Sequence, residues 1–124
     1  VQAGAVHLAD LADLPVVRLD VRDPLGTLVS HACREAGVGL STAFTVQTYH
    51  AALALAHHGL AVAIVDACTA ASADRAKVDV LTLQPQIDVP IKSLRTVNRP
   101  SSLLASAMTQ CMRQAVVETL GLVQ

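Results

Sequence analysis

The chain has 124 residues, which allows one small domain with a single core. It is 52% hydrophobic but only 2% aromatic, so Ala, Val, Leu and Ile must supply that core, and a disordered chain is excluded. Nine Lys and Arg against ten Asp and Glu give a net charge of -1, which lacks the basic excess of a nucleic-acid-binding domain. We therefore expect no DNA contact from these residues.

Secondary structure alternates along the sequence. The pattern predicts, in chain order, a strand over 14–19, a helix over 25–36, a strand over 43–46, a helix over 49–58, a strand over 60–65, a short helix or turn over 66–74, strands over 78–83 and 91–97, and a helix over 102–120. Residues 60–65 are consecutively apolar, which predicts a central parallel strand covered on both faces. We expect an α/β fold, with a parallel sheet and helices on both faces joined by right-handed crossovers.

Polar residues and a glycine mark the predicted helix ends. Asp23 can cap the first helix, Pro24 suits its first turn, and Gly37 can end it. Thr45 or Thr48 can cap the second helix. In parallel sheets, function sits at the carboxyl ends of the strands, where helix N-termini favour anionic groups. The loops predicted at that edge hold residues 20–26, 45–49 and 66–69.

Metal ions and cofactors are not expected. The cysteines, Cys33, Cys68 and Cys111, include no Cys-x-x-Cys pair, so we expect reduced and mostly buried thiols. His50 and His57 share a helix face, but no Cys or carboxylate at ligand spacing joins them.

Catalysis is not expected either, because the sequence has no nucleophile elbow, phosphate-binding loop or Cys–His constellation. The apolar runs are too short to span a bilayer and no signal peptide is visible, which favours a cytoplasmic protein. The chain begins at Val1 without an initiator Met, and we expect it to be a fragment of a longer protein.

Three segments together resemble one family. Asp66-Ala67-Cys68-Thr69-Ala70 follows an apolar strand, Asp23-Pro24-Leu25-Gly26 follows the first strand, and Arg99-Pro100-Ser101-Ser102 opens the last helix. In their order along the chain these segments resemble the effector-binding domain of LysR-type transcriptional regulators, and the resemblance covers nearly the whole chain. The segment at Asp66 is similar to the Asn/Asp-Pro-x-Thr-Ala segment of the branch that contains the lysine-biosynthesis and opine-catabolism regulators, with Ala67 in place of Pro.

The resemblance implies one Rossmann-like lobe of a periplasmic-binding-protein type II domain, whose parallel sheet has a mixed edge. Residues 1–97 would form the second effector-binding lobe, with 91–97 as its returning crossover strand. Residues 98–124 would form the helix that packs on a missing first lobe. The fragment would expose that surface, so we expect a dimer, with swapped C-terminal elements as one form. The full-length parent would form dimers or tetramers and contact DNA through an absent winged helix-turn-helix.

The implied function is to bind a small effector, an amino acid or an opine-like compound, in the cleft between two lobes. We expect Thr45, Gln47 and Thr48 to bind its carboxylate, and Asp66 to meet an ammonium or amide group. The candidate effector-binding residues are Asp23, Pro24, Leu25, Gly26, Thr45, Val46, Gln47, Thr48, Asp66 and Thr69.

Two alternatives stay open at this point. The capping residues can be purely structural, each contributing about 1 kcal/mol to helix stability. The chain can also be a lobe of a solute-binding protein from a transport system, which shares the fold.

Overall fold

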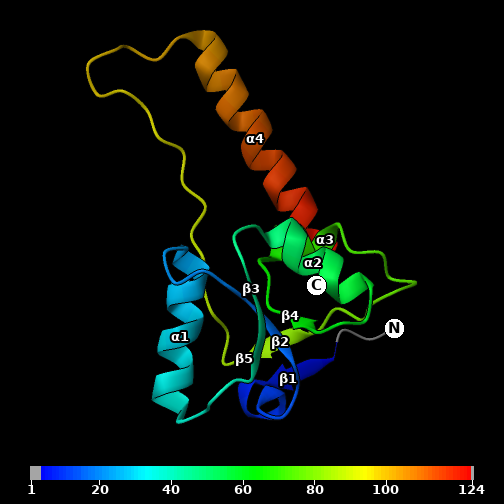
Figure 1. Ribbon diagram of the computed structural model, residues 1–124. Coiled ribbons are helices and arrows are strands. Elements are labelled where there is room, and N and C mark those ends of the chain that lie inside the picture. Colours follow the sequence, from blue (N-terminus) through cyan, green and yellow to red (C-terminus); the bar gives the residue numbers. More distant parts are fainter. Residues whose placement is uncertain (1–3, 124) are drawn as a thin grey trace.

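The computed structural model describes residues 4–123, and strands and helices alternate along them (Figure 1). The elements are β1 (Ala5–His7), the 3₁₀ helix η1 (Leu8–Leu11), β2 (Val16–Leu19), α1 (Pro24–Ala36), β3 (Thr42–Val46), α2 (Tyr49–His57), β4 (Val62–Ala63), α3 (Ala67–Ala71), β5 (Thr82–Gln84) and α4 (Leu103–Gly121). The alternation confirms the predicted α/β class. None of these helices is long and apolar enough to cross a membrane.

The strands form two parallel sheets. One sheet has the order β3-β2-β4, and the other pairs β1 with β5. Figure 1 shows α1 on one side of the three-stranded sheet and α2 with α3 on the other, and both α1 and α2 contact β2. The predicted parallel sheet with helices on both faces is therefore confirmed.

Local signals set the ends of the first two helices, as the sequence predicts. Asp23 caps α1, where its Oδ1 accepts a hydrogen bond from the Leu25 N–H at 2.9 Å. Gly37 ends α1 in the left-handed conformation, with φ at 65°. Thr48, and not Thr45, caps α2 by accepting a hydrogen bond from the Ala51 N–H at 3.2 Å.

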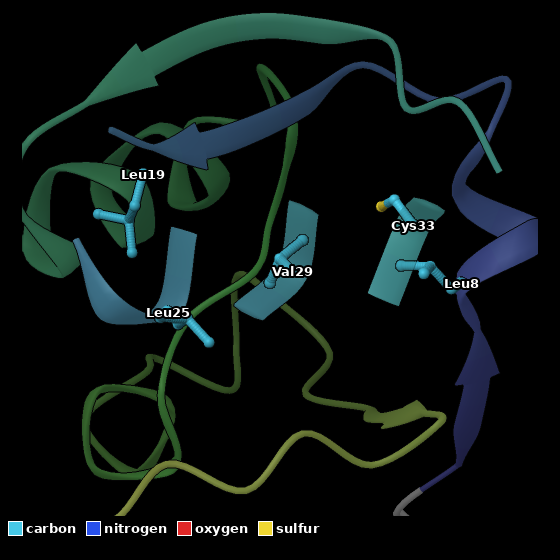
Figure 2. Close-up of a cluster of buried hydrophobic side chains, with 5 residues drawn as sticks. All are labelled: Leu8, Leu19, Leu25, Val29 and Cys33. Atoms are coloured by element: carbon cyan, nitrogen blue, oxygen red, sulfur yellow. The ribbon is translucent and has the colours of Figure 1, made fainter. Parts of the chain in front are cut away.

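The core joins α1 to the strands. Its main cluster contains Leu8, Leu19, Leu25, Val29 and Cys33, drawn in Figure 2. Three of these side chains come from α1, one from η1 and one from the end of β2. The apolar face of α1 is thereby fixed against the strand end that precedes it.

The prediction of a central strand over residues 60–65 is wrong in length and position. Only Val62 and Ala63 form β4, which lies at the edge of its sheet and is half-buried. β2 takes the centre, and its Val16 and Val17 are fully buried. A run of apolar residues reports burial but not the order of strands, because order depends on which neighbours supply hydrogen bonds.

The later strands are also shorter than predicted. Within 78–83, only the last two residues belong to β5. The predicted strand over 91–97 is wrong: none of these residues is in a strand, and Leu94 is 94% exposed. No strand in the described residues lies beside this segment to complete a ladder.

The C-terminal helix is confirmed as α4 and lies apart from the core. Ser102 caps it by accepting a hydrogen bond from the Ala105 N–H at 3.1 Å. α4 extends away from the sheets and touches α3 (Figure 1). Its apolar residues Leu104 and Met108 are exposed. Cys111 is also exposed and Cys68 half-buried, so the expectation of mostly buried thiols holds only for Cys33.

Candidate functional site

Three helices begin at one edge of the β3-β2-β4 sheet. Because the strands are parallel, their carboxyl ends lie together, and α1, α2 and α3 start within a few residues of them. Each helix begins at a side-chain cap, formed by Asp23, Thr48 and Asp66 respectively. The structure therefore brings the three predicted loops to the same edge.

A hydrogen bond joins two of these helix starts. The Tyr49 hydroxyl donates to Oδ1 of Asp23 at 2.6 Å, and the same oxygen accepts from the backbone of α1. Tyr49 is the first residue of α2, so this bond holds the beginnings of α1 and α2 together. Our sequence interpretation missed Tyr49 as a site residue, although the only tyrosine of the chain, directly after a cap, was an available signal.

Burial and nearby negative charge perturb this tyrosine. Burial, followed by the hydrogen bond to Asp23 and the charges of Asp23 and Asp66, raises the pKa of Tyr49 to about 12. The phenol therefore remains a neutral donor at physiological pH. The influence of both aspartates at one hydroxyl makes this part of the edge electronegative, which suits an ammonium group.

We expect Asp23→Asn to lower the pKa of Tyr49 from about 12 toward its ordinary value of 10.0. Folding raises this pKa, so the protonated Tyr49 contributes to the free energy of unfolding. This contribution is fully present below pH 10.0 and is lost as the pH rises toward 12. The chain has one Tyr and no Trp, so tyrosinate absorbance in a pH titration reports Tyr49 alone. Asp79→Asn is the matched control, and equal midpoints in both variants would contradict the assignment.

Asp66 is held by the helix that it caps. Its Oδ1 accepts from the Thr69 N–H at 3.0 Å, and its Oδ2 accepts from the Thr69 hydroxyl at 2.6 Å. Thr69 is buried, with 7% of its surface exposed. The buried Thr69 therefore orients the carboxylate of Asp66, and Asp66 is the more accessible of the two residues.

The other predicted residues divide between the surface and the core. Thr45, Gln47 and Thr48 are exposed, whereas Val46 is half-buried and packs against the core cluster. Leu25 is itself a member of that cluster, so it supports the wall of the site from inside. The exposed polar side chains that the sequence assigned to a carboxylate thus remain accessible.

Pro24 and Gly26 place the first turn of α1. Pro24 is exposed at the first helical position, where its missing N–H costs nothing. Gly26 is buried, and a Cβ there would lie 2.5 Å from the carbonyl oxygen of Asp20. The helix therefore sits directly on the end of β2, and this contact fixes the position of Asp23.

A pocket of about 180 Å³ opens beside the same edge. It is lined by Arg18, Leu19, Asp20, Val21, Thr42 and Thr45. The side-chain hydrogen bonds that Asp20 accepts from Arg22, together with one from the Arg22 N–H, lower the pKa of Asp20 to about 2. Our sequence interpretation missed Arg18, although a charged residue between two apolar strand residues was a usable signal.

Metal-ligand groupings are not found in the part of the chain that the structure describes: no three His, Cys, Asp or Glu side chains gather between residues 4 and 123. His57 has a structural contact instead, because its Nε2 accepts a hydrogen bond from the Asp74 N–H at 3.1 Å. This bond ties the end of α2 to the loop after α3.

The sequence matches a known family model over most of its length. The family model described as the LysR substrate binding domain matches residues 1–117. This chain belongs to that family. The LysR substrate-binding domain is the effector-binding part of LysR-type regulators, so the chain has a place in transcription regulation. No curated protein and no solved structure matches it significantly.

Proposed function

We propose that this LysR substrate-binding domain senses a small, amino-acid-derived effector at the carboxyl edge of the β3-β2-β4 sheet. The proposal rests on one observation: hydrogen-bond donors and negatively charged side chains lie together at that edge. Thr45, Gln47 and Thr48 are exposed donors, and Asp23 and Asp66 provide negative charge around Tyr49. An effector that has both a carboxylate and an ammonium group complements this arrangement, and an amino acid or an opine-like compound has both.

The aspartates retain capacity for such a ligand. Both oxygens of Asp66 accept one hydrogen bond from Thr69, and each carboxylate oxygen can accept a second. Oδ1 of Asp23 already accepts two hydrogen bonds, which leaves Oδ2 for a ligand. We propose that Asp66 binds the ammonium group of the effector and that residues 23–26 line the adjacent wall of the binding site.

Coupling to the rest of the regulator follows from a two-lobe arrangement. In this proposal residues 1–97 are the second lobe, and residues 98–124 pack on a first lobe. The exposed apolar side chains of α4 support a covering partner of this kind. An effector in the cleft shifts the lobes only by its difference in affinity for their two arrangements, typically about 1 to 3 kcal/mol.

The readout would be the geometry of a dimer or tetramer on DNA, with DNA bound through a separate winged helix-turn-helix. The proposal also includes a cytoplasmic location, membership of the branch that contains the lysine-biosynthesis and opine-catabolism regulators, and no cofactor or catalytic role. A solute-binding lobe shares this fold, but the match to the LysR family over 117 residues favours the regulator.

Thermal-shift screening of amino acids and opines on a complete two-lobe effector domain tests the proposal. We expect Thr45→Val to remove one donor and Asp66→Asn to remove the charge while keeping an oxygen that can cap α3. Each change should weaken the strongest ligand about tenfold, or about 1.4 kcal/mol.

Thr82→Val and Asp79→Asn are matched controls because both residues are exposed and lie outside the proposed site. They should leave the ligand-induced shift intact. Unaltered affinity in both site variants would contradict the proposed binding mode, and no stabilising ligand in the panel would contradict the effector class.

A further inference from the structure

We propose that the pocket lined by residues of β2 and β3 binds a carboxylate group, and that Arg18 is the residue that recognises it. The inference rests on the proposed effector-sensing function. It adds a positively charged residue for the effector's carboxylate, which the sequence analysis did not identify. Arg18 lines this pocket together with Thr42 and Thr45.

The strand register places the relevant groups side by side. Arg18 on β2 pairs with Thr45 on β3, so their side chains leave the sheet on the same face. Thr42, near the start of β3, adds a second hydroxyl to the pocket wall. Thr45 was already a candidate carboxylate ligand, and the pairing puts a cation beside it.

The guanidinium of Arg18 is positioned by a neutral partner. Its Nη2 donates to the Ser30 hydroxyl, and that hydroxyl donates in turn to the Gly26 carbonyl oxygen at 2.8 Å. Ser30 thus orients the arginine without neutralising it. Arg18 is also half-buried, where an uncompensated charge gains more from an anionic ligand than it would at an open surface.

No acidic side chain within residues 4–123 forms an ion pair with Arg18. The ion pairs formed within residues 4–123 join Arg22 to Asp20, His31 to Glu35 and Lys77 to Asp74, and none includes Arg18. Asp20 lines the same pocket, but both of its oxygens accept hydrogen bonds from Arg22. The Asp20–Arg22 pair is internally balanced, which leaves Arg18 as the excess positive charge of the pocket.

The chemistry of the pocket selects a small planar anion. An arginine side chain presents a fork of N–H donors that matches the two oxygens of a carboxylate, and the threonine hydroxyls can donate to the same group. The pocket has a volume of about 180 Å³. That space suits the acidic end of an effector.

Titration of the ¹⁵N-labelled chain with sodium succinate tests the proposal, with succinamide and inorganic phosphate compared at constant ionic strength. We expect saturable shifts of the Thr42 and Thr45 amides and of the Arg18 Nε–H with succinate, and none with succinamide. Arg18→Gln should weaken succinate at least tenfold, and Arg18→Lys should weaken it less. The control Arg75→Gln, at an exposed arginine outside the pocket, should change nothing.

A second variant covers the case in which Arg18→Gln does not fold. Ser30→Ala leaves the charge but removes its anchor, so it should weaken succinate a few-fold. Equal binding by the arginine variants and the wild type, equal binding of succinamide, or tighter binding of phosphate would overturn the proposal. Because succinate is the probe, this result is independent of the effector screen: a hit in that screen with unaltered succinate binding by Arg18→Gln would uphold sensing and refute the role of Arg18.

Discussion

Gly26→Ala is expected to lower the free energy of unfolding by about 1 to 3 kcal/mol, toward the upper end of that range. The added Cβ would lie 2.5 Å from the Asp20 carbonyl oxygen and 2.9 Å from that of Leu19. Both atoms belong to the backbone at the end of β2, so neither can rotate away as a side chain could. The first turn of α1 must therefore move off the strand.

Urea denaturation of the variant measures this loss of stability. Gly39→Ala is the matched control, because a Cβ at Gly39 meets no atom within 4 Å, and its effect should stay within about 1 kcal/mol. Displacement of α1 would also move Asp23 away from Tyr49, so the pKa of Tyr49 should fall in Gly26→Ala as well. Equal denaturation midpoints for the two alanine variants would show that α1 does not rest on β2 in this way.

Leu8→Ala is expected to cost about 2 to 5 kcal/mol of unfolding free energy. Leu8 is 2% exposed and packs in the cluster with Val29 and Cys33, so its removal leaves a cavity between η1 and α1. Thermal or urea denaturation provides the measurement. Leu94→Ala makes the same chemical change at a side chain that is 94% exposed, and it should shift stability by no more than about 0.5 kcal/mol. Comparable losses in both variants would mean that the cluster is not the core.

The helix ends could be predicted from the sequence because their signals are local. Asp23, Gly37 and Thr48 act on backbone groups within a few residues, and the structure shows each at its predicted helix end. Strand extents could not be predicted in the same way. Residues 60–65 are consecutively apolar and residues 91–97 include Ile91, Leu94 and Val97. A strand forms only where a neighbour offers backbone partners, however, and neighbours are a property of the whole fold.

The candidate site shows the same division. Parallel topology places the loops after β2, β3 and β4 at one edge, so their gathering was predictable once strands and helices alternated. The contact between Tyr49 and Asp23 and the pairing of Arg18 with Thr45 were not predictable, because they depend on the packing of α2 against α1 and on the register of β2 with β3. The binding roles of these residues remain predictions.

Chemical-shift mapping of the strongest effector on the complete two-lobe domain tests the proposed site most directly. We predict that the largest amide shifts within this lobe cluster at residues 23–26, 45–48 and 66–69, and that Asp66→Asn reduces them at equal ligand concentration. Shifts concentrated at β1 and β5, with no change at the three helix starts, would contradict effector binding at this edge.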